Sequence, residues 1–208
     1  MDRNKPAAKR ILKMSTDATH ISIPDFLIKG QDTVCKAFTG SGIHSFHQAI
    51  HYVRHLPYGR NTDKNDLTTL FKDHCGTCST KHALLKVLAD EHQIEDLQLI
   101  IGLYKMNDNN TPRVAQTLAQ YGLEYIPEAH CYLKYQGRIF DFTKANSKAS
   151  DFENDLIEET AIEPHQISEY KIAYHKKYLQ HWLNTEKPDV ASLSALWHIR
   201  EQCIKALS

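Results

Sequence analysis

The sequence has no net charge, and this absence excludes several kinds of partner. Its 25 Lys and Arg residues are matched by 25 Asp and Glu residues. The chain therefore lacks the positive excess that attracts nucleic acid or an anionic membrane surface. It also has no apolar run that approaches the roughly 20 residues of a membrane-spanning helix. We expect neither a nucleic-acid partner nor a membrane partner.

A secretory signal is also missing. The N-terminal segment MDRNKPAAKRILKMSTD is basic but has no apolar central region. We therefore expect a cytoplasmic protein with reduced thiols, and we interpret residues 1–15 as a flexible tail. The five cysteines agree with this interpretation, because an odd number does not suit a disulfide framework.

What is present is the composition of an ordinary globular protein, 41% hydrophobic and 24% charged. The sequence has no internal repeat and no low-complexity linker. A chain of 208 residues is long enough to bury a core and short enough to form one domain. We therefore expect a single domain over residues 1–208.

The order of the periodic segments predicts an α+β domain. A helical pattern stops before Pro57, and a second begins at Cys78 and is hydrophobic nearly all round, as in a central helix. The apolar run Leu97–Met106 predicts a buried strand, and EAHCYLKYQGRIFDFT predicts a hairpin. From 151 to 208 we expect helices that cover the core.

Two cysteines three residues apart, Cys75 and Cys78, allow three interpretations. A structural zinc site needs four ligands, and no second CxxC occurs. A thioredoxin-like redox pair needs a preceding strand, whereas the segment before Cys75 has a helical pattern. A nucleophile at Cys78 would feel the positive end of the helix dipole, which lowers a thiol pKa. In that case Gly76 would allow the tight turn into the helix.

The hairpin places an imidazole and a carboxylate on one face of the sheet. A two-residue turn at Gln136-Gly137 gives pairs whose residue numbers sum to 273, so Tyr135 pairs with Arg138. His130 and Asp141 then become diagonal neighbours. Cys131, Phe140 and Phe142 face the opposite side as core residues. We expect the N-terminus of the Cys78 helix, and not its middle, to meet the face with His130.

These residues together resemble the transglutaminase-like superfamily. The shared pattern is Gly76-x-Cys78-x-x-x-x-Ala83-x-Leu85, then His130-x-Tyr132, then Asp141-x-Thr143. The resemblance covers about residues 67–143 and leaves 1–44 and 151–208 outside. It implies a papain-like core in which the nucleophile helix packs on a small antiparallel sheet, with additional N- and C-terminal helices.

The resemblance also implies a catalytic triad. Cys78 would be the nucleophile, His130 the general base and acid, and Asp141 the carboxylate that orients the imidazole. The chain departs from the usual family pattern at Lys81-His82, at Ile139, and in the helix predicted between the two core strands. These departures concern the substrate more than the triad.

The implied function is cysteine-dependent acyl transfer through a thioester, without a metal or a cofactor. The substrate would be an amide or ester of a peptide, protein or small molecule. Water as acceptor would make the protein an amidase or peptidase, and an amine would make it a transglutaminase-type transferase. The Cys78 N–H and a further donor would bind the oxyanion. Asn61 or Tyr58 could supply that donor, although a plain loop is the simpler interpretation. A non-catalytic binding module on the same fold and a thiol-redox CxxC protein remain as alternatives.

Overall fold

The computed structural model describes residues 23–186 and 188–207, and this part of the chain is α+β. The flexible tail predicted for residues 1–15 lies outside the described residues. The helices are α1 (Thr33–Gly40), α2 (Phe46–His55), α3 (Thr69–Asp73), α4 (Cys78–Asp90), α5 (Ala115–Gln120), α6 (Glu169–Glu186) and α7 (Leu193–Ala206), and the strands are β1 (Leu97–Asn107), β2 (Tyr125–Tyr135), β3 (Arg138–Phe140) and β4 (Leu156–Ile162).

The four strands form one antiparallel sheet in the order β3-β2-β1-β4. Strands β1 and β2 pair along their whole length, from Leu97↔Tyr135 to Asn107↔Tyr125. Strand β3 covers only the last three residues of β2, from Leu133 to Tyr135. Along the rest of β2, this edge has no neighbouring strand among the residues that the structure describes.

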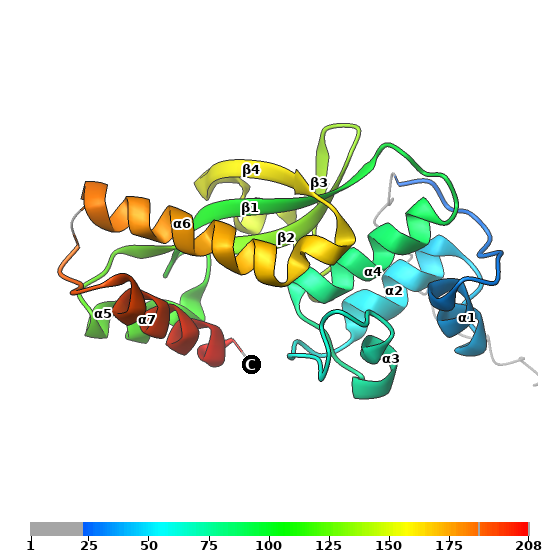
Figure 1. The fold of residues 1–208 in the computed structure, drawn as a ribbon, viewed down its shortest axis with the longest axis horizontal. Helices are drawn as coiled ribbons and strands as arrows, with labels where there is room; N and C mark the ends of the chain where they lie inside the picture. Colours follow the sequence, from blue (N-terminus) through cyan, green and yellow to red (C-terminus); the bar gives the residue numbers. More distant parts are fainter. Residues whose placement is uncertain (1–22, 187, 208) are drawn as a thin grey trace, which may run out of the picture.

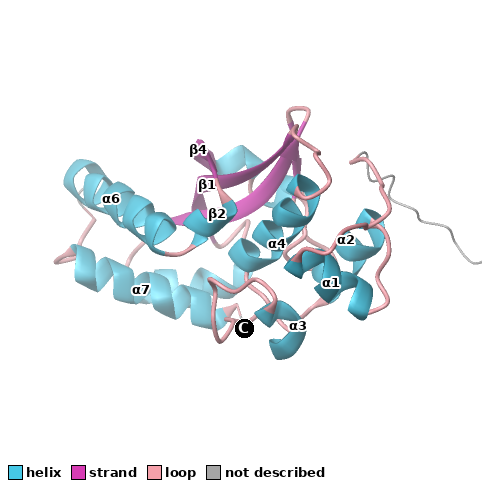
Figure 2. Ribbon diagram, turned by 45° about the vertical axis from the view of Figure 1, so that its right-hand side comes forward, coloured by secondary structure: helices cyan, strands magenta, loops and turns pink. Residues whose placement is uncertain are grey.

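The sheet separates two groups of helices, each with its own apolar core. Figures 1 and 2 both show α1–α4 gathered on one side of the molecule and α6 and α7 on the other, where Figure 1 also shows α5. Side chains alternate along a strand. The first core accordingly contains Leu99, Ile101 and the buried face of α4, and the second contains Ile100, Met106 and the buried faces of α6 and α7.

Helix α4 is the central helix that its composition predicts. It begins at Cys78, after a capping box in which Thr77 and Thr80 each hydrogen-bond the other's backbone N–H. Its buried residues lie on several sides, because it packs against the sheet and against α1 and α2. A helix held in this way is a rigid support for its first residue.

Two other predictions have different outcomes. The Gln136-Gly137 turn is confirmed, with φ values of 48° and 76°, as two-residue hairpin turns require. The prediction of helices throughout 151–208 is wrong for Leu156–Ile162, which forms β4 and pairs with β1. Glu158 and Glu159 favour a helix locally, but hydrogen bonds to the edge of β1 outweigh that preference.

None of the helices in the described part of the chain has both the length and the apolar character needed to cross a bilayer.

Candidate active site

The predicted nucleophile is the first residue of α4. Cys78 is buried, with 8% of its surface exposed. Its backbone N–H and that of Ser79 donate no hydrogen bond within the described residues, as is usual in the first turn of a helix. Two free donors and the positive end of the helix dipole therefore lie at the thiol.

The turn into α4 differs from the prediction in detail. The residue in the left-handed region is His74, with φ of 50°, and not Gly76. A Cβ on Gly76 would lie 2.9 Å from Lys81 Cγ and 3.0 Å from Leu70 Cδ2. Gly76 is therefore explained by close packing beneath the helix start.

The hairpin brings His130 and Asp141 together as its register predicts. The pairs Leu133↔Phe140 and Tyr135↔Arg138 confirm that register. Asp141 lies one residue beyond the end of β3, and its Oδ2 is 2.9 Å from His130 Nε2. Its Oδ1 accepts the backbone N–H of Thr143 at 2.8 Å. The carboxylate is therefore held by both of its oxygens.

The thiol lies beside this pair. Cys78 and His130 line the same cavity, and each favours the charged form of the other. Since Nε2 of His130 already bonds Asp141, Nδ1 is the ring nitrogen left for the sulfur. The body of α4 packs on the opposite sheet face, in the same core as Cys131. Cys78 is the residue of α4 that lines the cavity with His130, and the His82 ring, one turn later in the helix, lies 6.4 Å from the His130 ring.

His82 is a buried histidine to which the sequence patterns assign no role. Its ring links Cys78 to the Asp141 segment by two hydrogen bonds. Its Nε2 accepts the Phe142 N–H at 2.7 Å, so its Nδ1 carries the proton and donates to the Cys78 carbonyl, also at 2.7 Å. Burial lowers the pKa of His82. The ring is therefore neutral, and its 3.6 Å approach to Asp141 is not an ion pair.

Lys81 has a similar structural role. It is completely buried, and its Nζ donates to the carbonyls of Leu56 and Thr143 at 2.5 and 2.7 Å. Burial and the nearby Lys144 charge lower the pKa of Lys81 to about 8. Lys81-His82, a departure from the family pattern, thus holds the helix to its neighbours.

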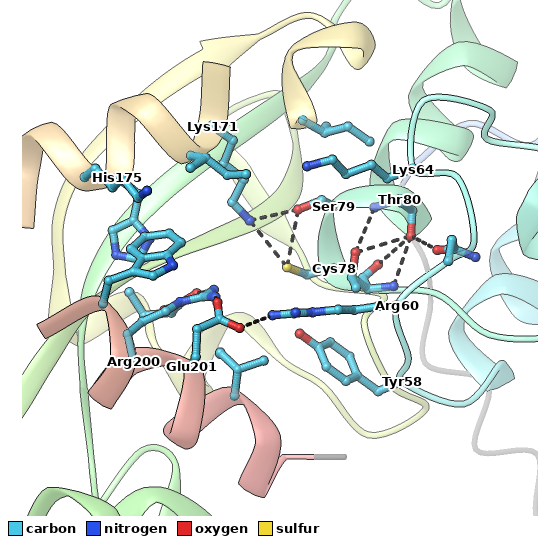
Figure 3. Close-up of a pocket in the computed structure, with 18 residues that line it drawn as sticks. Tyr58, Arg60, Lys64, Cys78, Ser79, Thr80, Lys171, His175, Arg200 and Glu201 are labelled. Carbon is cyan, nitrogen blue, oxygen red and sulfur yellow. Dashed lines mark hydrogen bonds and ion pairs between the residues drawn. The ribbon is translucent and has the colours of Figure 1, made fainter. Parts of the chain in front are cut away.

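A lysine from the C-terminal helices lies on the other side of the thiol. The Nζ of Lys171, on α6, is 3.8 Å from Cys78 Sγ and 2.8 Å from Ser79 Oγ (Figure 3). Sequence analysis did not identify Lys171. The available signal was its place on the buried stripe of α6, where it lies one turn before His175 and two before Leu179.

The surroundings of Cys78 favour its thiolate. A hydrogen bond from Cys131 lowers the pKa of Cys78 most, and Lys171 and His130 lower it further, although burial acts in the opposite direction. Burial disfavours the charged form of His130, but Asp141 and Cys78 outweigh it and raise the pKa of His130 to about 10. These surroundings therefore favour the thiolate of Cys78 and the imidazolium of His130.

Cys78 lies at the junction of two cavities. The smaller one, of about 340 Å³, is lined by His130 and Asp141. The larger one, of about 580 Å³, is lined by Lys171 and by residues of α6 and α7. Cys78, Tyr58 and Glu128 line both. A substrate could therefore extend in both directions from the sulfur.

The carboxylates of the larger cavity are paired with arginines. Arg200 forms a two-pronged ion pair with Glu128, at 2.8 and 2.5 Å. Arg200 also donates to Glu201, which accepts a second hydrogen bond from Arg60 at 2.5 Å (Figure 3). This network joins α7 to β2 and to the loop before α3.

Asn61 does not have the free amide that an oxyanion donor needs. Its Nδ2 donates to the Cys75 carbonyl at 3.0 Å, and its Oδ1 accepts from Thr80 at 2.8 Å. Asn61 therefore holds the loop to the start of α4. Tyr58 lines both cavities.

The two cysteines of the CxxC have different surroundings. Cys75 lies against the loop, with its Sγ 3.9 Å from the Arg60 carbonyl, and lines neither cavity. Burial raises the pKa of Cys75, whereas the pKa of Cys78 is lowered. No group of three or more metal-ligating side chains occurs within residues 23–186 and 188–207.

Comparisons of the chain with protein-family models, with curated proteins and with solved structures gave no significant match.

Proposed function

We propose that the protein is a cysteine-dependent acyl-transfer enzyme that acts on an amide or ester bond through a thioester at Cys78. The observation that carries the proposal is the position of Cys78 at the junction of two cavities, one of which it lines together with the hydrogen-bonded pair His130 and Asp141. The order of these residues along the chain, and the packing of α4 on an antiparallel sheet, also support a papain-like, transglutaminase-like core.

In the acylation step the Cys78 thiolate attacks the carbonyl carbon, and the carbonyl electron pair moves onto oxygen. The free N–H groups of Cys78 and Ser79 are available to bind this oxyanion. When the intermediate collapses, the bond to the leaving group breaks, and the imidazolium of His130 protonates the leaving amine or alcohol. The products are a thioester and a neutral His130.

In the second step His130 accepts a proton from water or from an amine, which attacks the thioester. The carbon–sulfur bond breaks, and the sulfur leaves as a thiolate beside a regenerated imidazolium. Asp141 stays ionised and stabilises that imidazolium. The acceptor decides whether the enzyme is a hydrolase or a transferase, and both follow the same proton path.

Acylation by p-nitrophenyl acetate tests this proposal without knowledge of the natural substrate. We expect a stoichiometric burst of p-nitrophenol and one acetyl group on the peptide that contains Cys78, by mass spectrometry. Cys78→Ala should abolish both, whereas Cys203→Ala, a buried thiol in the second core, should abolish neither. Release of p-nitrophenol at the same rate from Cys78→Ala would instead favour a non-catalytic binding module.

A further inference from the structure

The larger cavity carries an excess of positive charge. Five cationic side chains line it, Arg60, Lys64, Lys171, Lys176 and Arg200, against the two carboxylates of Glu128 and Glu201. His175 also lines it, but burial lowers the pKa of His175, so this ring is neutral. The cationic side chains therefore outnumber the carboxylates by three, in a chain whose net charge is zero.

The excess resides on the lysines. The two carboxylates are bonded to Arg200 and Arg60. Within the described residues, no carboxylate lies within ion-pair distance of Lys64, Lys171 or Lys176. Lys176 instead lies over the Trp197 ring, 4.8 Å from its centroid.

Lys171 is the member of this set that most needs an anion. It is 9% exposed, and a buried ammonium without a counter-charge is strongly destabilising. In the resting protein the Cys78 thiolate, with its sulfur 3.8 Å away, supplies negative charge. In the thioester that sulfur is neutral, so the ammonium loses its nearest anion when the acyl group arrives.

An acyl group with its own negative charge would restore the balance. Figure 3 shows Lys171 and Lys64 reaching into the same space from opposite walls, with Cys78 beneath them. Ile172, Ile204 and the Trp197 ring supply apolar surface in the same cavity. The cavity thus suits an aliphatic or aromatic acyl chain that carries an acidic group.

We propose that the larger cavity binds acyl donors that carry a carboxylate or another anionic group, held by Lys64, Lys171 and Lys176. This proposal names the substrate class of the acyl transfer proposed for Cys78, and it rests on that function.

Two p-nitrophenyl esters of equal chain length test it, the butyryl ester and the succinyl monoester. Their acyl groups differ only in a terminal methyl or carboxylate. The measured quantity is the ratio of the two second-order acylation rate constants, each corrected with Cys78→Ala. We expect the wild-type protein to favour the succinyl ester, and each of Lys64→Gln and Lys176→Gln to lower the ratio by roughly fivefold. About 1 M salt should abolish the preference.

Lys177→Gln is the matched control. Lys177 is exposed on α6 beside Lys176 but does not line the cavity, so its loss should leave the ratio unchanged. A ratio that stays the same in Lys64→Gln and Lys176→Gln, while Cys78 is still acylated, would overturn the anionic substrate and leave the acyl transfer intact.

Alkylation gives a second measurement that needs no ester turnover. Iodoacetate and iodoacetamide are similar in size and differ in charge, and their rates at Cys78 can be followed by peptide mass spectrometry. The lysine variants should lower the iodoacetate-to-iodoacetamide ratio, and Lys177→Gln should not. An unchanged ratio overturns this inference alone. A Cys78 no more reactive than the other four thiols overturns it together with the proposed function.

Discussion

The two cavities beside Cys78 differ in how their charges are matched. In the smaller cavity, the Asp141 carboxylate is hydrogen-bonded to His130, and His130 and Cys78 each favour the charged form of the other. In the larger cavity, three lysines have no carboxylate partner among the described residues. Groups that already interact with one another are suited to moving protons. Lysines without a carboxylate partner are suited to binding an anion. We therefore interpret the first as the chemical half of the site and the second as the recognition half.

The largest effect should follow a change on the chemical side. Asp141→Asn keeps the shape of the side chain but removes the charge that stabilises the His130 imidazolium. We expect a loss of about 10³–10⁴-fold in acylation by p-nitrophenyl acetate. Circular dichroism should be unchanged. Asp151→Asn, in the same cavity but bonded to the backbone of Lys148, is the control and should retain activity. A loss below tenfold in Asp141→Asn would contradict the role of the carboxylate.

His82→Leu should remove the two hydrogen bonds that hold the start of α4 to the segment after β3. It leaves the Phe142 N–H and the Cys78 carbonyl buried without partners, which costs about 2–4 kcal/mol in the free energy of unfolding by urea. His92→Leu is a matched control, because His92 also lies within 2.8 Å of a carbonyl four residues back and accepts a backbone N–H, from Lys29. His92 is only partly buried, so its loss should cost less. Equal losses of unfolding free energy in the two variants would contradict a larger structural role for His82 than for His92.

A smaller effect is expected when one charge is removed from the recognition side. Lys171→Met takes a positive charge from beside the sulfur, which disfavours the thiolate and raises the pKa of Cys78. The pH profile of iodoacetamide alkylation at Cys78 should therefore move up by about one pH unit, so that the rate is roughly tenfold lower on the acid limb of the profile. The rates of variant and wild type should converge as the pH rises and both thiols ionise. Lys177→Met should leave the pH profile unchanged. A Lys171→Met rate that stays low at high pH would indicate damage to the fold.

The smallest effect is expected at the other cysteine of the motif. Cys75 lines neither cavity, so Cys75→Ser should change the acylation rate by less than about twofold, within the usual range for substitutions away from a site. The measurement is the same p-nitrophenol burst. A loss as large as that of Cys78→Ser would favour a two-thiol redox protein.

The chemical side could be predicted from the sequence because local rules determine it. The start of α4 follows from a capping residue and an apolar pattern, and the pairing of β2 with β3 follows from a two-residue turn. A fixed register then places His130 near Asp141, whatever the rest of the chain does.

The recognition side depends on tertiary packing, which local sequence patterns do not reveal. Lys171 is about ninety residues from Cys78 and meets it only because the first turn of α6 lies beside the start of α4. A lysine on an amphipathic helix normally indicates a solvated face. Strand β4 was missed for a related reason, since its glutamates favour a helix and only the free edge of β1 makes it a strand.

The His82 ring has a consequence for hydrogen exchange. The Phe142 amide hydrogen is buried against His82 Nε2, and the same ring holds the Cys78 carbonyl. That hydrogen can exchange with deuterium only when the segment after β3 separates from α4. The exchange rate of this single amide therefore measures how often the start of α4 and the Asp141 segment come apart in the native protein.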